Sequence, residues 1–460
     1  MAVVTTTKIS QLTEDIRLDP EFYQPKYLES DRVISKIGGK NLGEIADIAY
    51  GTTPEGGIFE ESGIPFLRSQ NFSDHVVTSD YVFCSKNFHI EHLNSKCIAS
   101  DILFAAIGAT IGDYAIVPHW IKEANINQNI ARVRITDKKF LPEYIWAFFL
   151  TEYGQFQLRR YPTGNAQPYL NTFQFNRFKI PYLKNQEKFT GVINEIFDSI
   201  DKANKFYPEA EQELLERMEW DKVQTDHVLS YAATSKDVLS DERLDPEFYQ
   251  PKFENLERHL KKIGALRLGD FCPMPNRGSL IEYDENGEVF VINSKDLGGN
   301  GLIDLEGTHR TNKIEITKTE NQESLVRQFD LIFYAIGAYA GRTNCYLEKE
   351  IAFAGNNVLI IRPDNKIIDP VYLSLFLNSK AGLLLSQKYA AGSAQKFFHP
   401  KSLMKYPVFT PRDKNGKPDL AWQKKLADKV VAAYKAKKSA KQKIEEAKRL
   451  VEDEIEKLLH

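Results

Sequence analysis

Short apolar runs, bounded by Gly, Asn and Asp, recur through two stretches of this chain. Runs of four to six residues rich in Ile, Val and Phe are typical of buried β-strands. The sequence predicts strands at Ile64–Leu67, Ile102–Ala106, Ile130–Ile135, Val289–Ile292, Leu331–Tyr334 and Val358–Ile361. Each set is followed by a helix that opens with proline, Pro142–Leu150 and Pro370–Leu377, where a missing N–H costs nothing. The pattern therefore predicts two α+β domains of modest sheets and long loops.

Two longer periodic stretches follow these domains. After the proline-containing strand Ile180–Leu183, apolar residues recur at spacings of three and four from Phe189 to Ala203, which predicts a helix with one apolar stripe. Pro208 is expected to kink or interrupt this helix near Tyr207. After a second such strand, Tyr406–Phe409, a helix is predicted from about Leu420 to Leu459, with a stripe close to a heptad seam. A helix this long needs a partner, and antiparallel pairing of the two helices is expected.

The chain is a tandem repeat. The ten-residue block Arg17–Lys26 occurs again without a mismatch at Arg243–Lys252. Farther along, Asp101–Ala109 is similar in sequence to Asp330–Ala338, and the stretch that begins at Gly164 is similar to the one that begins at Gly392. We expect two tandem modules related by an approximate two-fold axis and separated by the helices. The predicted parts are 1–183 and 221–412, the latter including a polar linker, with spacer helices over 184–220 and 413–460.

Composition narrows the functional classes. Hydrophobic residues make up 42% and charged residues 27%, as in globular proteins, and no apolar run reaches the roughly 20 residues of a membrane span. The four cysteines form no C-x-x-C pair and the start lacks a secretory pattern, so a cytoplasmic protein without structural zinc is expected. The net charge of −3 confines any nucleic-acid surface to a local patch.

The order of domain, helix, domain, helix resembles the specificity subunit of type I restriction–modification systems. The resemblance covers essentially the whole chain and rests most specifically on Thr163–Asn171 followed by Asn185-Gln186-Glu187. It is supported by Gly108–Gly112 with Asn125–Asn129, whose second copies are Gly337–Gly341 and Gly355–Asn357. The second copy departs from the pattern at His399 and at Trp422-Gln423.

The resemblance implies a recognition subunit without catalysis of its own. Each globular unit would read one half of a split site in double-stranded DNA, and the helices would set the gap. The partners implied are two copies of an adenine methyltransferase and a motor-nuclease subunit. S-adenosylmethionine, ATP and Mg²⁺ would belong to those partners, and no cofactor or metal to this chain. Because the two units have diverged, the half-sites should differ.

Candidate DNA contacts are Arg, Lys, Asn and Gln residues beside predicted strands and turns, because these side chains match base edges and phosphates. In the first unit they are Arg68, Gln70, Asn71, Arg159 and Arg160; in the second they are Asn293, Lys295, Arg342, Asn344 and Lys388. Arg68 and Asn293 occupy equivalent positions, and Arg suits guanine whereas Asn suits adenine. The alternative for each is a solvated loop residue.

Features that both copies share are unsuited to distinguishing one DNA half-site from the other. Gln167 and Gln395, in turns that begin at Gly164 and Gly392, are interpreted as structural, with DNA proximity as the alternative. The block Arg17–Lys26 is identical in both copies, so it cannot distinguish DNA sequences. A packing role is favoured for it, and the alternative is a surface that two partner subunits use in the same way.

Other functional classes lack support. Asp19-Pro20-Glu21-Phe22 lacks the second proline of an amino-methyltransferase signature, and there is no P-loop or clustered histidine motif. Three alternatives remain: a duplicated DNA-binding regulator or antirestriction decoy, an enzyme in its own right, and a coiled-coil adaptor that binds no DNA.

Overall fold

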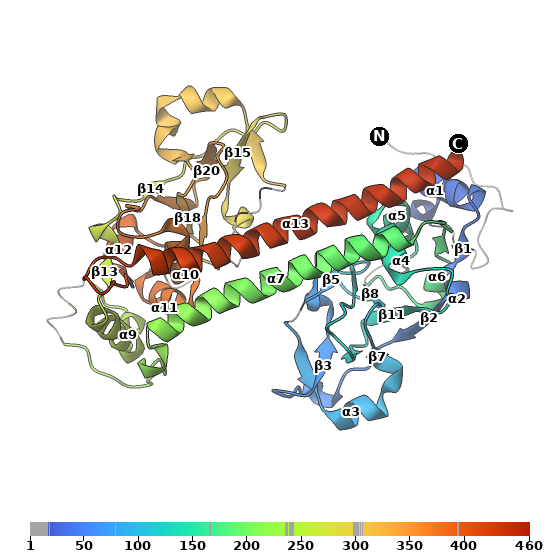
Figure 1. Ribbon diagram of the computed structural model, residues 1–460, viewed down its shortest axis with the longest axis horizontal. Helices are drawn as coiled ribbons and strands as arrows, with labels where there is room; N and C mark the ends of the chain where they lie inside the picture. The colour runs from blue at the N-terminus through green and yellow to red at the C-terminus, as the bar shows by residue number, and fades with distance from the viewer. Residues whose placement is uncertain are drawn as a thin grey trace. The chain divides into compact units, whose positions relative to one another are not determined.

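The computed structural model describes residues 17, 19–78, 80–164, 167–234, 238, 243–297, 303, 305, 307–392 and 395–460. The chain divides into two compact units (Figure 1). Unit 1 comprises Met1–Asp201 with Ala436–His460, and unit 2 comprises Lys202–Lys435. Each unit is described by itself below.

Unit 1 contains a set of short strands. They are β1 (Lys40–Asn41), β2 (Ala46–Tyr50), β3 (Ile64–Leu67), β4 (Phe72–Ser73), β5 (Val76–Val77), β6 (Val82–Cys84), β7 (Lys96–Cys97), β8 (Ile102–Ala105), β9 (Tyr114–Ile116), β10 (Ala124–Ile126), β11 (Ile130–Ile135) and β12 (Lys179–Ile180). Its α-helices are α1 (Pro25–Lys36), α2 (Leu42–Ile45), α3 (Lys86–Glu91), α4 (Pro142–Leu150), α5 (Glu152–Arg160) and α6 (Thr172–Asn176). Helix α7 (Glu187–Arg217) begins in this unit, and α13 (Leu420–Leu459) ends in it.

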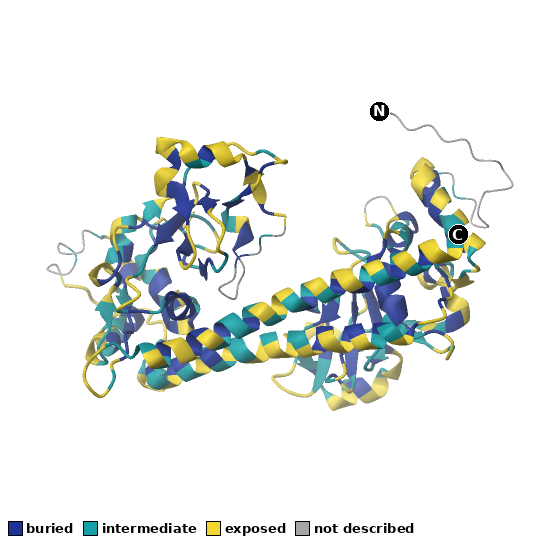
Figure 2. Cartoon of the chain, turned by 45° about the horizontal axis from the view of Figure 1, so that its top comes forward, coloured by how far each residue is buried: buried dark blue, intermediate teal, exposed yellow. Residues whose placement is uncertain are grey.

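Two main sheets organise unit 1. The larger has the order β2-β11-β8-β9-β5-β4, and the smaller has the order β6-β3-β10-β7, in which β10 and β3 run parallel. Helix α4 is apolar all round and every residue from Tyr144 to Leu150 is buried, because it packs between the larger sheet and the long helices. In both units of Figure 2 the dark-blue, buried residues gather in the globular parts.

Unit 2 repeats this plan with its own strands. They are β13 (Leu266–Arg267), β14 (Asn276–Arg277), β15 (Val289–Ile292), β16 (His309–Thr311), β17 (Leu325–Val326), β18 (Leu331–Tyr334), β19 (Thr343–Cys345), β20 (Ala352–Ala354), β21 (Val358–Ile361) and β22 (Pro407–Val408). Its α-helices are α9 (Pro251–Lys262), α10 (Pro370–Asn378), α11 (Lys380–Tyr389) and α12 (Pro400–Met404), together with the end of α7 and the beginning of α13.

The strand orders of unit 2 match those of unit 1. The order β14-β21-β18-β19 corresponds to β2-β11-β8-β9, and β16-β15-β20-β17 corresponds to β6-β3-β10-β7, again with a central parallel pair. The β5-β4 extension is seen in unit 1, whereas the described part of this sheet in unit 2 ends at β19. We call the globular part of unit 1 the first head and that of unit 2 the second head.

The predicted mixed α+β fold is confirmed. Five of the six predicted strands and the helix Pro142–Leu150 have the predicted bounds. The strand predicted to end at Ala106 ends at Ala105, and the helix predicted to end at Leu377 ends at Asn378. The repeated motif Asp101–Ala109 forms β8 and the turn after it. Asp101 ion-pairs with Arg134 (2.7 Å) in the first head, and Asp330 pairs with Arg362 (3.0 Å) in the second.

Both heads close with a two-stranded sheet. In unit 1, β12 pairs antiparallel with β1, and it ends before Pro181, which has no N–H to donate. In unit 2, β22 pairs with β13 and includes Pro407 at its first position. Gln186 and Gln423 then hold the helix entries in the same way. Each side-chain oxygen accepts a backbone N–H at 2.8 Å, from Leu141 and Asp369 respectively.

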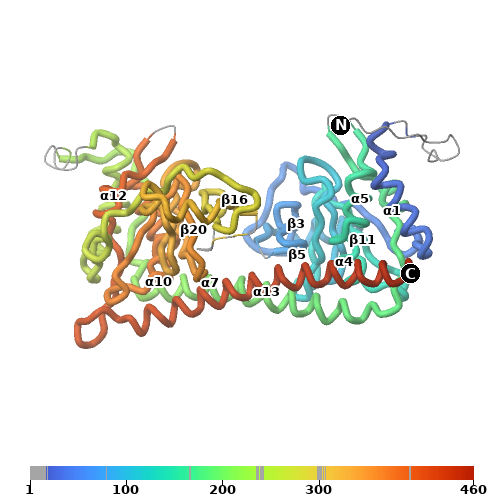
Figure 3. The backbone as a smooth tube through the Cα atoms, turned by 90° about the horizontal axis from the view of Figure 1, so that it is seen from above, coloured from blue at the N-terminus to red at the C-terminus, as the bar shows by residue number. Residues whose placement is uncertain are grey.

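The long helices pair antiparallel within unit 1. Lys188 of α7 contacts Glu454 of α13 (3.1 Å), and Glu195 contacts Lys443 (2.8 Å), so the partners run in opposite directions. Hydrogen bonding from Lys188 lowers the pKa of Glu454. The end of α13 also reaches α1, where Lys36 Nζ donates to the carbonyl of Leu459 (3.1 Å; Figure 3).

The same pairing is found within unit 2. Glu213 of α7 accepts from Lys425 of α13 (2.7 Å), and hydrogen bonds from Lys425 and Lys429 lower its pKa. Arg217 pairs with Asp419 (2.7 Å) and stacks on Trp422 (4.3 Å). The predicted antiparallel helices are therefore present. Among the described residues, no helix combines the length and apolarity that a membrane crossing requires.

Helix α7 continues through Pro208, so an interruption there is wrong, whereas the expected kink near Tyr207 stays a prediction. Proline removes the hydrogen bond to the carbonyl four residues earlier, which is that of Asn204. Packing offsets the loss: Ala210 and Leu214, two and six residues after Pro208, are buried in the core of unit 2 with Tyr207 against them.

Replacing Pro208 by alanine is expected to stabilise unit 2 by about 2 kcal/mol, because alanine restores the missing N–H in a helix that is already formed. Denaturant unfolding of the full chain, followed by circular dichroism, measures the change. Alanine at Asn204, whose N–H is already present, should leave stability within about 0.5 kcal/mol. A destabilised Pro208→Ala variant would contradict this account of the helix.

Candidate nucleic-acid interface

In both heads the repeated block (Arg17–Lys26 and Arg243–Lys252) makes contacts within the head, and we call this set of contacts the fastening. In the first, Arg17 pairs with Asp19 (2.7 Å) and donates to the carbonyl of Tyr161 (2.9 Å), while the hydroxyl of Tyr23 donates to the carbonyl of Arg17 (2.8 Å). In the second, the pair Arg243–Asp245 (2.6 Å) and the bond from the Tyr249 hydroxyl to the carbonyl of Arg243 (2.8 Å) repeat this arrangement. The identity of the block thus follows from identical packing.

Two candidate DNA contacts belong to this fastening. Arg160 is buried, stacks on Phe22 (4.0 Å), donates to its carbonyl (2.7 Å) and ion-pairs with Asp31. Lys388 is its counterpart: it pairs with Glu257 (2.6 Å) and lies over Phe248 (4.8 Å). We therefore assign both cations to packing. Arg159, which precedes Arg160 in α5, is exposed.

At one edge of the first head, the turn after β10 accepts backbone hydrogen bonds from two loops, those after β2 and β8. The carbonyl of Ile126 accepts from Thr52 N (3.1 Å), and that of Asn129 accepts from Ala106 N (2.8 Å). Gly51 makes the first approach possible, because a Cβ there would lie 2.1 Å from the Ile126 oxygen. We call residues 126–129 the hub turn.

The second head has the same hub turn at residues 354–357. The carbonyl of Ala354 accepts from Ser279 N (3.0 Å), and that of Asn357 accepts from Ala335 N (3.1 Å). Gly278 takes the place of Gly51, since a Cβ there would meet backbone oxygen at 2.1 Å. The scaffold of this edge is therefore conserved between the copies.

Arg68 and Asn293 occupy equivalent cap positions beside the hub turns. Each follows the central strand and precedes a short 3₁₀ helix, Ser69–Asn71 or Ser294–Asp296. The third residue of each helix accepts the cap N–H: Asn71 from Arg68 (2.8 Å) and Asp296 from Asn293 (2.7 Å). Asn71 is buried by this bond, so it positions Arg68 rather than facing solvent.

Polar groups beside the first cap are left unsatisfied. Among the described residues, Arg68 Nε and Asn127 Oδ1 are buried atoms without a hydrogen-bond partner. The two residues that carry them are neighbours, because Asn127 N donates to the carbonyl of Leu67 (3.2 Å), the residue before Arg68. Buried polar groups are almost always paired in proteins, so this pair is a place where water or a ligand would bind.

The remaining candidates differ in exposure. Gln70 and Lys295 are exposed beside their caps. Arg342 is half-buried and stacks on Tyr339 (4.1 Å), which is itself 58% exposed. Asn344 is buried in β19.

The glycine turns are built alike and lie next to the hub. Gly164 has φ +100° and Gly392 has φ +89°, and a Cβ at either would press on the carbonyl of Gln167 or Gln395. The amide side chains of Gln167 and Gln395 are exposed. Asn165, Ala166, Ser393 and Ala394 of these stretches lie outside the described residues.

The structure adds residues that sequence reasoning missed. Phe59 packs 5.5 Å from the Arg68 guanidinium, and the hydroxyl of Tyr283 lies 3.5 Å from Asn293 Oδ1. His309 stacks on Tyr283 (4.2 Å). Only strand pairing relates these residues to the caps, so their spacing in the sequence carries no signal.

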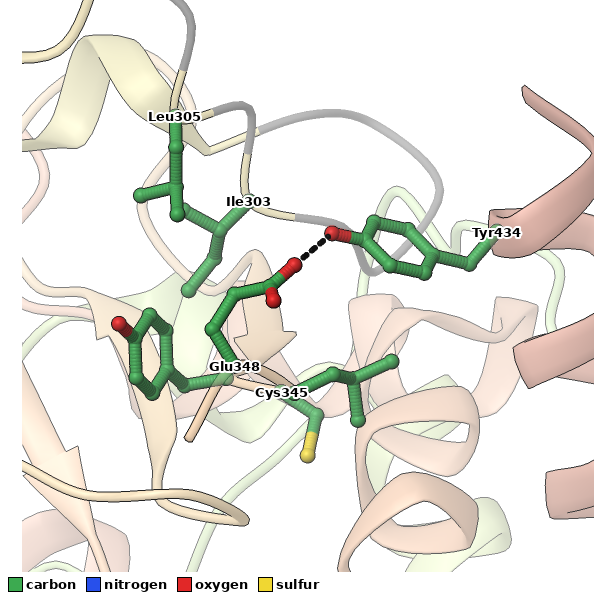
Figure 4. Close-up of a pocket in the computed structure, with 7 residues that line it drawn as sticks. Ile303, Leu305, Cys345, Glu348 and Tyr434 are labelled. Atoms are coloured by element: carbon green, nitrogen blue, oxygen red, sulfur yellow. Dashed lines mark hydrogen bonds between the residues drawn. The ribbon is translucent and has the colours of Figure 1, made fainter. Parts of the chain in front are cut away.

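The heads offer little catalytic chemistry. Among the described residues, no cluster of three or more His, Cys, Asp or Glu side chains could hold a metal. Burial raises the pKa of the Cys272 thiol to about 12, which makes it unreactive. A small pocket in unit 2 is lined in part by Tyr434 of α13 (Figure 4). The hydroxyl of Tyr434 donates to Glu348 Oε1 (2.9 Å), so it attaches the head to its helix.

Comparison with known proteins supports a recognition role. Residues 36–216 match the family model described as type I restriction modification DNA specificity domain. No curated protein matches the chain. Two solved structures cover 91% of this chain: the S subunit of a type I restriction-modification system from M. genitalium and the HsdS subunit from Thermoanaerobacter tengcongensis. The alignments cover 95% of each of those chains. Identities are 11% and 15% and TM-scores 0.43 and 0.28, and we base no conclusion on these two structures.

The matched domain includes the first cap, the first hub turn and all of α7 except its last residue, and the second head repeats its strand orders. A DNA specificity domain is a recognition module and not a catalytic one, in agreement with the expectation of a non-enzymatic chain. Residues 36–216 are thus similar to the DNA specificity domain of type I restriction–modification systems.

Proposed function

We propose that this chain reads a split, asymmetric site in double-stranded DNA, with one half-site recognised by each head. The observation that carries the proposal is the pair of cap positions. Arg68 and Asn293 sit on matching backbone scaffolds, each after a central strand and before a capped 3₁₀ helix. Arginine pairs with guanine and asparagine with adenine, so one scaffold presents two different readers.

In the first head, we assign base reading to Arg68 and Gln70, and phosphate contact to the exposed Arg159. Arginine on a surface helix contacts phosphate without sequence information. In the second head, Asn293 and Lys295 are the counterparts, and Arg342 beside the exposed Tyr339 is a further contact. Gln167 and Gln395 are exposed and are further candidates for contact with the same duplex.

We further propose that the chain docks two copies of an adenine methyltransferase and a motor-nuclease subunit. These partners would carry S-adenosylmethionine, ATP and Mg²⁺. In this division, 1–183 and 221–412 recognise DNA, and the helical segments 184–220 and 413–460 space the heads and receive partners. We expect the assembly to act in the cytoplasm, where it would reach genomic DNA.

A binding selection tests the proposal. The full chain is incubated with random duplexes, and the bound sequences are determined. We expect two short, unlike sequence blocks at a fixed separation, with affinity that falls as salt rises. Selection of no sequence would refute DNA recognition. Failure to co-purify with the methyltransferase would refute the partner assignment and favour a regulator or decoy.

A further inference from the structure

The second head carries a solvent-facing cluster that the first head lacks. Tyr283 and His309 stack with ring centroids 4.2 Å apart and planes 16° from parallel. Lys295 Nζ lies 3.1 Å from His309 Nε2, and the Tyr283 hydroxyl lies 3.5 Å from Asn293 Oδ1. Tyr283, His309 and Lys295 are all exposed. We call these three residues the reading row.

Strand register identifies the corresponding residues of the first head. His309 pairs with Val291 as Val82 pairs with Phe66, so Val82 takes the place of His309. Asp284 N donates to the carbonyl of Arg310 (2.9 Å) as Glu60 N donates to that of Phe83 (2.8 Å), which aligns Tyr283 with Phe59. Lys295 and Gln70 are each two residues beyond their cap.

The scaffold is therefore kept while the exposed chemistry changes. The first head presents Phe59, Val82 and Gln70 where the second presents Tyr283, His309 and Lys295. Packing alone would not require three polar or charged groups at positions that a phenylalanine and a valine also fit. Positions that vary on a fixed frame are those at which two heads could read different bases.

The hydrogen bonds define the donors that the row offers. A lysine ammonium only donates, so His309 must accept at Nε2 and carry its proton on Nδ1. The row thus presents the His309 Nδ1–H and the remaining protons of Lys295. Guanine N7 and O6 in the major groove are acceptors that suit such donors. Glu282 and Glu285 are exposed on the same loop and disfavour phosphate there.

We propose that Tyr283, His309 and Lys295 read purine base edges in the half-site of the second head. Asn293, the reader assigned at the cap, also positions this row, because its amide nitrogen donates to the carbonyl of Val291 (3.0 Å) and its oxygen accepts from the Tyr283 hydroxyl (3.5 Å). This inference rests on the proposed function and names the residues that would recognise one of the two half-sites.

The test exchanges each residue for its counterpart in the first head. The variants His309→Val and Lys295→Gln are compared with the wild-type full chain by selection from random duplexes. Each should lose about tenfold discrimination at one or two adjacent positions of a single half-site. Tyr283→Phe keeps the ring and removes the hydroxyl, so it should lose less. His227→Val and Lys349→Gln, also in unit 2, are matched controls and should change nothing.

The unaltered half-site serves as an internal measure of folding. Unchanged preferences in both half-sites would overturn the proposal, and so would a uniform loss of binding to all sequences, which indicates phosphate contact or misfolding. If the wild-type chain selects no sequence, the proposed function fails instead, and the two failures are thereby distinguished.

Discussion

Replacing Arg160 by methionine is expected to lower the free energy of unfolding by about 3 kcal/mol. The substitution removes a buried cation that pairs with Asp31, donates to the carbonyl of Phe22 and stacks on its ring. Loss of one partner from a buried ion pair costs about 3–5 kcal/mol because the other charge stays uncompensated. Asp31 retains 28% exposure, so water relieves part of the penalty and the lower end is expected. Denaturant unfolding measures the loss.

Arg159→Met is the matched control, because Arg159 is the adjacent arginine and is exposed. Its effect on stability should stay within about 0.5 kcal/mol. The two variants separate packing from DNA contact, since Arg160→Met should act on stability and Arg159→Met on DNA affinity. Equal stability of the two variants would contradict the fastening role of Arg160 and return it to the DNA-binding candidates.

Arg68→Ala is expected to relax the half-site read by the first head, with a loss of about 1–3 kcal/mol of discrimination at one base pair. The half-site of the second head should be unaffected, because the residues proposed to read it lie in unit 2. Removal of the guanidinium also removes the unsatisfied Nε beside Asn127, so stability should change little. Selection from random duplexes measures the change in preference.

Arg159→Ala provides the contrast for Arg68→Ala. A phosphate contact should weaken binding to all sequences alike and reduce the magnitude of the salt slope by about one. If Arg68→Ala instead weakened binding uniformly and left the preferences intact, its role as a base reader would be refuted.

The fold could be predicted closely because its signals are local. The strand Ile130–Ile135 and the helix Leu420–Leu459 each have a continuous hydrophobic pattern, and their packing agrees with the element that the pattern predicts. Pro208 is the exception: local chemistry predicts a break, but burial of Ala210 and Leu214 in the core of unit 2 holds the helix together. Tertiary burial of this kind has no signature in the helix itself.

The site could be predicted only in part. The cap positions of Arg68 and Asn293 followed from repeat alignment, which places equivalent residues on equivalent strands. Arg160 and Lys388 have the composition of DNA contacts, and only the packing of the repeated block against them shows a different role. His309 reaches Tyr283 through antiparallel pairing of β15 with β16, a relation that sequence spacing does not express.

The central claim is that one duplicated scaffold presents different readers to two half-sites. Selection of random duplexes by the wild-type full chain tests it most directly. The account predicts two unlike blocks at a fixed separation, with Arg68→Ala altering one and Lys295→Gln altering the other. A single block, a palindromic pair, or one block altered by both variants would contradict it.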